Sequence, residues 1–403
     1  MDIDCVVVGG GPAGLAASVA LTARAVEHVV FERGRPGQTW RSQRWDSFRL
    51  NTPGWANAML GAQDRGAFLT AGEVVERLDR LAAECPVRAG VPVTRLSPDG
   101  GGFVLDTGVG RVRSRAVVVA TGDENVPRVP ALARAIPDQV AQLHAADYRG
   151  PADLPAGAVL VVGSGQSGCQ IAEDLVQGGR RVILATSPVG RAPWRHRGRD
   201  TQEWLFDAGF FHQRIDDLPD PALAHAPRPV FGSGGRSLSL QSLARAGVTL
   251  TGRMVDVKGH RIVVDDTLAA NVAVGDAFAA RARAMVDDII RREGIEAPPA
   301  EPDPTDEPVD LPSTATVDVL TEGIGSLVWC TGFTADFSWL PGGLLDGAGH
   351  PAHDGTAATL TGVWYLGLHW LTHRSSDTLN GMPRDAAQVA DSVRAHLDHI
   401  RRP

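Results

Sequence analysis

Residues 5–14 read CVVVGGGPAG, and residues 159–168 read VLVVGSGQSG. Each stretch is a short run of apolar residues, then a GxGxxG pattern, then a helix-forming segment. A buried strand followed by this glycine-rich turn and a helix is typical of a dinucleotide-binding βαβ unit. Because a second copy follows about 150 residues after the first, the sequence predicts two dinucleotide sites on one chain.

The three glycines of each pattern have separate roles. The first allows a tight turn, the second lets a pyrophosphate approach the backbone, and the third lets the helix pack against the strand. Free amides and the dipole at the start of the helix then face the phosphates. The residues expected at the first pyrophosphate are Gly9, Gly11, Pro12, Ala13 and Gly14, and those at the second are Gly163, Gly165, Gln166, Ser167 and Gly168.

The strand after the first glycine-rich turn ends in an acid. Residues 29–31 are apolar, and Glu32 follows them, eighteen residues after Gly14. A carboxylate at this place accepts hydrogen bonds from the adenosine ribose hydroxyls. Glu32 and its neighbour Arg33 are therefore expected to bind the nucleotide of the first site.

The equivalent strand of the second unit ends without an acid. Residues 181–185 are followed by Thr186 and Ser187, and then by Arg191 and Arg195. A missing carboxylate with guanidinium groups nearby is what a 2′-phosphate requires, so this site is expected to favour NADPH over NADH, with Ser187, Arg191 and Arg195 as contacts. A solvated loop in an arginine-rich protein is the alternative for the two arginines.

Composition excludes several classes of function. The 403 residues suffice for two or three domains, and a net charge of −8 argues against a nucleic-acid or anionic-membrane partner. The four cysteines are scattered, with no CxxC pair, which excludes a dithiol redox centre and favours reduced thiols in a cytoplasmic protein. The apolar run of residues 6–26 follows two aspartates and contains three consecutive glycines, so we expect neither a targeting segment nor a membrane helix.

Two further strands end in similar Thr-Gly turns, Ala120-Thr121-Gly122 and Cys330-Thr331-Gly332-Phe333. Together with both GxGxxG turns and Glu32, they make the chain resemble the flavin-containing monooxygenase-like flavoproteins. The likeness preserves the order of the motifs over nearly the whole chain, and the segment from Trp194 to Trp204 is similar to uncharacterised bacterial oxidoreductases of this group.

The resemblance implies an α/β fold with two Rossmann-like domains, in which FAD occupies the first site and NADPH the second. It also implies flavin contacts at Ala120, Thr121 and Gly122, and an adenine contact from the backbone of Val93. Gln38, Thr39 and Trp40 would lie beside the flavin, Asn51 and Thr52 between flavin and nicotinamide, and Thr378 and Leu379 beneath the flavin pyrimidine. Asn51 is the expected catalytic residue.

The chain departs from the family at one motif. Family monooxygenases carry Phe-x-Gly-x-x-x-His-x-x-x-Tyr/Trp before the second GxGxxG; here His144 and Tyr148 are kept, but Asp138 and Val140 replace the Phe and Gly. His144 is therefore either a linker residue that ties the domains together or a catalytic residue.

We expect the NADPH domain to be inserted in a discontinuous FAD domain. The FAD domain would comprise residues 1–150 and 325–403, and the NADPH domain residues 151–324. Within the insert we expect a β-hairpin over residues 248–264, an amphipathic helix over residues 276–293 and a proline-rich extended connection over residues 297–312. A helix is expected from Asp385.

The implied activity is that of an FAD-dependent, NADPH-using monooxygenase, in which oxygen adds at flavin C4a and is transferred to a nitrogen, a sulfur or a ketone of a small molecule. Molecular oxygen and that small molecule are the expected partners, and a homodimer is left open. The alternatives are a flavin-dependent reductase without oxygen insertion and a non-catalytic dinucleotide sensor.

Overall fold

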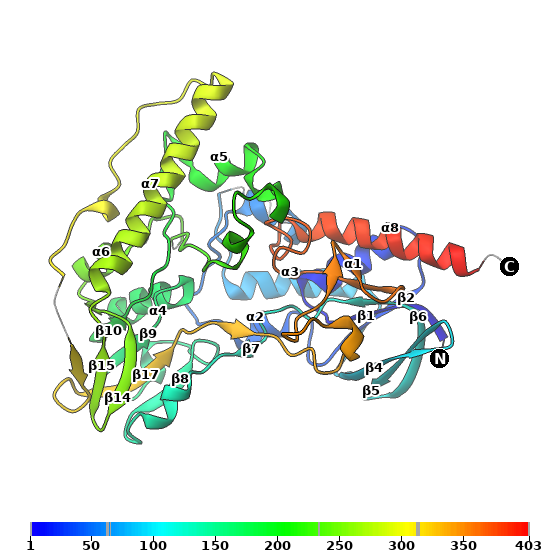
Figure 1. Ribbon diagram of the computed structural model, residues 1–403, viewed down its shortest axis with the longest axis horizontal. Coiled ribbons are helices and arrows are strands. Elements are labelled where there is room, and N and C mark those ends of the chain that lie inside the picture. Colours follow the sequence, from blue (N-terminus) through cyan, green and yellow to red (C-terminus); the bar gives the residue numbers. More distant parts are fainter. Residues whose placement is uncertain (1, 62–63, 65, 233, 312–314, 402–403) are drawn as a thin grey trace.

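The computed structural model describes residues 2–61, 64, 66–232, 234–311 and 315–401. Figure 1 shows two sheets side by side, each flanked by helices. The N- and C-terminal parts of the chain form one half, drawn in blue, cyan and red, and the green and yellow middle of the chain forms most of the other. The expected α/β fold with two Rossmann-like units is confirmed.

The first sheet has nine strands and a parallel centre. Its path runs β19-β20-β21-β6-β1-β2-β3, and β4 and β5 form an antiparallel hairpin that pairs with β6. Val7 of β1 lies opposite Val30 of β2 on one side and Val118 of β6 on the other. The strands are β1 (Asp2–Val8), β2 (His28–Glu32), β3 (Val87–Ala89), β4 (Val93–Asp99), β5 (Gly102–Thr107), β6 (Gly110–Val119), β19 (His353–Asp354), β20 (Ala357–Ala358) and β21 (Val363–Tyr365).

Two helices cover one face of this sheet. Helix α1 (Pro12–Thr22) is apolar nearly all round because it lies between the sheet and helix α8 (Met382–Ile400), and side chains of both helices share one core cluster with β1 and β6. Helix α8 begins three residues before Asp385, where its start was expected. The opposite face packs against the β4–β5 hairpin and the segment around Leu340.

The second sheet is entirely parallel and has the order β13-β10-β9-β17-β8. Its strands are β8 (Ala141–His144), β9 (Ala158–Val162), β10 (Val182–Ala185), β13 (Thr249–Thr251) and β17 (Ile324–Trp329), with helix α4 (Gln166–Gln177) after β9. The boundaries expected at 150/151 and 324/325 do not coincide with the limits of this sheet. Residues 141–144 and 324–329 pair with the sheet of the second unit, through Val328 opposite both Leu143 and Val161.

The chain crosses between the two sheets along two short antiparallel strands. β7 (Val126–Pro127) pairs with β18 (Phe333–Thr334), and β6 and β17 end just before them. Gly122 and Gly332 take positive φ angles of 73° and 84° where each crossing begins, a conformation that glycine adopts without steric cost.

Helical segments and a small sheet fill out the second unit. The long helix α7 (Leu268–Glu293) begins eight residues before the expected Asp276, and it extends away from the sheet in Figure 1. The expected hairpin is the shorter pair β14 (Met254–Lys258) and β15 (Arg261–Val264), joined by β16 (Thr316–Asp318). The proline-rich connection has only one helical turn in its described part, and Pro312 lies outside the described residues.

The remaining elements, apart from one helix of 13 residues, are short. They are α2 (Gln38–Ser42), α3 (Ala71–Ala83), α5 (Thr201–Asp207), α6 (Leu240–Arg245), β11 (Arg195–His196), β12 (Arg199–Asp200) and the 3-10 turns η1 (Gly54–Leu60), η2 (Ala131–Ala135), η3 (Pro151–Asp153), η4 (Phe210–His212), η5 (Ile215–Asp217), η6 (Pro221–His225), η7 (Pro304–Asp306) and η8 (Gly342–Leu344). Within the described ranges, no helix is long and apolar enough to cross a membrane.

Candidate dinucleotide-binding sites

The two glycine-rich turns are built in the same way. A Cβ atom on Gly9 would lie 2.5 Å from the carbonyl oxygen of Ala120, and a Cβ atom on Gly163 would lie 2.5 Å from the carbonyl oxygen of Cys330. Both glycines also have φ angles above 100°. Each first glycine is therefore required because the neighbouring strand, β6 or β17, ends against it.

Of the other glycines in each turn, one is needed for packing and one leaves space for a ligand. A Cβ on Gly14 or Gly168 would lie less than 2 Å from the carbonyl oxygen of the first glycine in its own turn, so both positions are closed. A Cβ on Gly11 or Gly165 would meet no atom within 4 Å. These open positions are the N-caps of α1 and α4, and no side chain caps either helix. Free amides beside open space fit a pyrophosphate in both turns.

Glu32 lies where the first turn meets β2. Its side chain is buried, and its carboxylate oxygens accept hydrogen bonds from the amides of Gly10 and Gly34, each at a distance of 2.7 Å. The backbone beside Glu32 is that of Val91, whose amide donates to the Glu32 carbonyl. Val93 lies two residues further, in β4, so Val91 is nearer than the expected Val93 to this nucleotide site.

Ser187 takes the place of Glu32 in the second unit. The amide of Ser164 lies 3.3 Å from the Ser187 hydroxyl oxygen, as the amide of Gly10 donates to Glu32. The Ser187 amide in turn donates to the Ser164 hydroxyl over 2.9 Å. A neutral hydroxyl therefore stands where the first site has a carboxylate, which removes the repulsion that a 2′-phosphate would meet.

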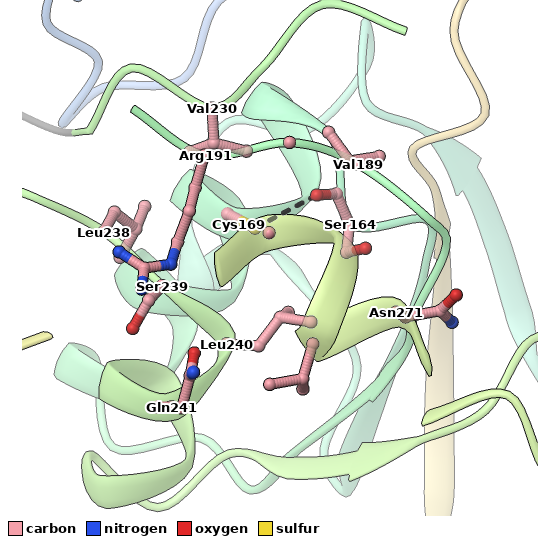
Figure 2. A pocket seen from close by; sticks show the side chains of 13 residues that line it. Ser164, Cys169, Val189, Arg191, Val230, Leu238, Ser239, Leu240, Gln241 and Asn271 are labelled. Carbon is pink, nitrogen blue, oxygen red and sulfur yellow. Dashed lines mark hydrogen bonds between the residues drawn. The ribbon is translucent and has the colours of Figure 1, made fainter. Parts of the chain in front are cut away.

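Arg191 does not face this site. Its guanidinium contacts Asp306 at 2.6 Å and Asp276 at 2.7 Å, and its side chain is buried. Figure 2 shows Arg191 reaching toward Ser239 and away from Ser164 along the wall of a small cavity. This geometry argues against the expectation that Arg191 reads the 2′-phosphate, because two carboxylates already satisfy its charge.

Arg195 lies farther away. The next residue, His196, contacts Asp287 of α7 at 3.0 Å, whereas Thr186 at the end of β10 accepts a hydrogen bond from Asn271 near the start of the same helix. Sixteen residues separate Asn271 from Asp287, or about 24 Å along a helix. This separation disfavours a contact between Arg195 and a phosphate beside Ser187.

Two of the residues expected around the flavin, Trp40 and Leu379, lie in the same cluster. Trp40, Leu50 and Leu379 pack in one apolar cluster with Leu15 of α1, which joins α2, the Asn51 segment and the start of α8. Gln38 and Thr39 lie on α2 beside Trp40, and the hydroxyl of Thr378 donates to the Ser375 carbonyl in the turn before α8. The buried hydroxyl of Thr121 has no hydrogen-bond partner within the described part of the chain. Such an unpaired group fits a bound ligand.

Asn51 lies between the two nucleotide-binding units. Ser47, four residues earlier, donates to Asp174 of α4 over 2.5 Å, and Gln202 of α5 donates to the Asn51 carbonyl over 3.0 Å. Among the described residues, no hydrogen bond engages the side-chain amide of Asn51. That amide is thus free to bind a ligand.

Asn57 is a positioning residue that the sequence did not reveal. It is fully buried, and its side-chain amide donates to the carbonyls of Thr52 and Pro53, while its amide oxygen accepts from the Thr52 hydroxyl. These bonds fix the turn that carries Asn51 and Thr52. A buried asparagine in a short apolar turn was the available signal, but its partners are invisible in the sequence.

The contacts of His144 are those of a structural residue and require no catalytic role. Its Nε2 donates to the carbonyl of Gly332, its Nδ1 accepts from the amide of Ala146, and its ring packs edge-on against Phe333. Burial lowers its pKa below the usual 6.5. The other retained motif residue, Tyr148, donates to Asp174 over 2.6 Å. This geometry supports the interpretation of His144 as a linker residue.

Comparison with known proteins places these sites in a family. The family model for pyridine nucleotide-disulphide oxidoreductases matches residues 6–218, which is more than half of the chain. The chain belongs to this family. It is therefore an oxidoreductase, and the expectation of an enzyme is confirmed.

The similarity to individual relatives covers nearly the whole chain. An uncharacterised CzcO-like oxidoreductase from Geobacillus kaustophilus is 26% identical over 98% of this chain and 99% of its own. A flavin-containing monooxygenase from Stenotrophomonas maltophilia has a similar structure, with a TM-score of 0.61, 22% identity and 98% of each chain covered. The ornithine N-hydroxylase KtzI from Kutzneria sp. 744, solved with reduced FAD, NADP⁺ and L-ornithine, has a TM-score of 0.65 at 17% identity, covering 98% of this chain and 99% of its own. The resemblance to flavin monooxygenases and uncharacterised bacterial oxidoreductases is confirmed.

Proposed function

We propose that this oxidoreductase is an FAD-dependent, NADPH-using monooxygenase that acts on a small molecule. The observation that carries the proposal is the position of Asn51. Its segment packs against the first nucleotide unit through Leu50 and is bonded to the second through Ser47 and Gln202. An amide held between two dinucleotide sites can orient a nicotinamide against a flavin.

The first site has the features that FAD needs. The open N-cap position at Gly11 and the amides of α1 would bind the pyrophosphate, and Glu32 would accept from the ribose hydroxyls. Trp40 and Leu379, which share the apolar cluster around Leu15, would pack against the flavin ring. FAD would supply the redox chemistry here, taking up a hydride and passing electrons to oxygen, while the protein would supply orientation and exclusion of water.

The second site would bind NADPH at the N-terminus of α4. Gln166 opens this helix and fixes the facing loop, because its side chain donates to the Gly232 carbonyl over 2.8 Å and accepts from the Phe231 amide. We base the preference for NADPH on Ser187, which presents no charge to a 2′-phosphate. Arg191 and Arg195 have no part in it.

A reductase without oxygen insertion is less well supported. Two disulphide reductases and a thioredoxin reductase share the fold. This sequence has no CxxC pair, which argues against a reductase that works through a protein dithiol, though not against one that passes electrons from flavin directly to a small acceptor.

Aerobic incubation with NADPH and a panel of amines, thioethers, ketones and aromatic acids tests the proposal. We expect one substrate class to gain an oxygen atom by mass, at the expense of NADPH. In Asn51→Ala, NADPH consumption should persist while peroxide replaces the oxygenated product. The control is Asn380→Ala, which removes the amide of a half-buried asparagine in the turn before α8 and should leave the oxygenated product in place. Consumption of NADPH by wild type with no oxygenated product from any class would contradict the proposal.

A further inference from the structure

Arg374 is a half-buried cation without an acidic partner. It lies in the loop between β21 and α8, and in the part of the chain that the structure describes no carboxylate comes within 4.0 Å of its guanidinium. Its Nη2 donates to the side-chain oxygen of Gln213 over 2.9 Å, and its Nε is buried with no partner. An unpaired buried donor is costly, and it marks a place where a ligand can bind.

Two aromatic rings fix the plane of this guanidinium. Its central carbon lies 4.0 Å from the ring centre of Phe210 and 4.6 Å from that of Trp370. Both distances fall within the range of cation–π attraction. The Nε–H lies in the plane of the guanidinium, where an incoming carboxylate can accept a hydrogen bond from it.

The surroundings of Arg374 keep solvent away from its guanidinium and supply no negative charge. Loss of solvent lowers the pKa of Arg374 to about 10, and no acid contributes to raise it. Arg44 is buried as well, but the negative charge of Glu124 acts on it. Arg374 is therefore better placed than Arg44 to gain from an anionic ligand.

Aromatic side chains continue from Arg374 toward the Asn51 segment. Phe210 packs on Phe211 of the same turn, and Phe206 of α5 lies 5.1 Å from Trp55, four residues after Asn51. The buried Nε1 of Trp55 has no partner among the described residues. We call Trp55, Phe206, Phe210, Phe211 and Trp370 the aromatic cluster. It lines the region where α5 and η4 of the second unit meet the loops of the first.

We propose that Arg374 recognises a substrate carboxylate and that the substrate of this enzyme is an aromatic acid whose ring contacts the aromatic cluster. The inference rests on the proposed function, since it names the substrate class of that site. Arg374 is a specificity-determining residue in this proposal, because it binds the acid group and takes no part in the transfer of oxygen.

Binding to the FAD-loaded protein without NADPH tests this directly. The probes are benzoate, phenylacetate and 3-phenylpropanoate, each compared with its neutral primary amide by calorimetry. We expect at least one acid to bind about tenfold or more tightly than its amide. Arg374→Gln should abolish this difference, Arg374→Lys should restore part of it, and Arg384→Gln, at an exposed arginine in the first turn of α8, should leave it unchanged.

A purely structural role gives different results. If Arg374 only fastens η4 to the loop before α8, Arg374→Gln should weaken the binding of acid and amide equally. Gln213→Ala, which removes the same link, should then lower the melting temperature as much as Arg374→Gln does. Equal binding of acids and amides to wild type, or no binding of any acid, would also overturn the proposal. Because the binding assay omits NADPH, its result does not depend on oxygen transfer. Selective acid binding in this assay, followed by aerobic turnover with NADPH that yields no oxygenated product, would overturn the proposed function alone.

Discussion

Arg191 and Asp306 form a 2.6 Å ion pair that ties the loop after β10 to the proline-rich connection. Asp276 of α7 shares the same guanidinium, and Gln241 donates to that carboxylate over 3.0 Å. Arg191 therefore holds together three segments that lie up to 115 residues apart in the sequence. These contacts give Arg191 a role in stability.

Loss of the Arg191 guanidinium should destabilise the fold. Arg191→Met should lower the free energy of unfolding by about 2–3 kcal/mol, less than a fully buried pair would cost because the two carboxylates are partly exposed. Urea denaturation measures this loss. The ratio of the KM values for NADPH and NADH should not change, and a selective rise for NADPH would show that Arg191 does reach the 2′-phosphate.

Gly9 and Gly11 should respond differently to an added side chain. Gly9→Ala places a Cβ against the Ala120 carbonyl at a φ angle of 107°, so it should destabilise the folded protein by about 1–3 kcal/mol. Gly11→Val meets open space, so the apoprotein should keep its melting temperature but bind no FAD. Thermal unfolding of the apoprotein and flavin content per chain measure both effects. Retained FAD in Gly11→Val would contradict the assignment of the first site.

Ser187 should set the coenzyme preference. Ser187→Glu recreates the carboxylate of the first site, so the KM for NADPH should rise by about tenfold or more through repulsion of the 2′-phosphate, while the KM for NADH changes little. Ser187→Gln has a similar size without the charge, and it should retain the preference for NADPH. Equal losses for both coenzymes in Ser187→Glu would mean that the residue only shapes the loop.

Stability should decrease as the pH falls below 6.5, and His144 should contribute to this. Burial lowers its folded pKa, so between that value and 6.5 the unfolded chain binds a proton that the folded chain does not. Protonation would also place a hydrogen on Nδ1, which now accepts from Ala146. His144→Gln should flatten the dependence of melting temperature on pH between about 5 and 7, without removing it, because His28 is shifted in the same direction. An unchanged slope would contradict this account, and a large loss of turnover would revive the catalytic interpretation.

Local patterns predicted the parts of the site that depend on local geometry. The turns at Gly9 and Gly163, and Glu32 at the end of β2, follow from spacing because a strand, a tight turn and a helix are consecutive in the chain. Asn51 remains a prediction, now supported by its place between the two units.

Non-local pairing explains what the sequence could not reveal. Residues 141–144 look like a linker, but they form the edge strand β8 of the second sheet by pairing with β17, nearly two hundred residues later. Arg191 was assigned to a phosphate because its two acidic partners lie far away in the sequence. Asn57 was missed for a similar reason, since its hydrogen bonds appear only when the turn has folded.

Labelled oxygen tests the central claim most directly. The enzyme would be supplied with NADPH, ¹⁸O₂ and the aromatic acid that binds most tightly, and the product analysed by mass while NADPH consumption is recorded. The account predicts one ¹⁸O atom in the product for each NADPH oxidised, with the second atom released as water. Consumption of NADPH with an unlabelled organic acid, and with all of the oxygen recovered as hydrogen peroxide, would contradict it.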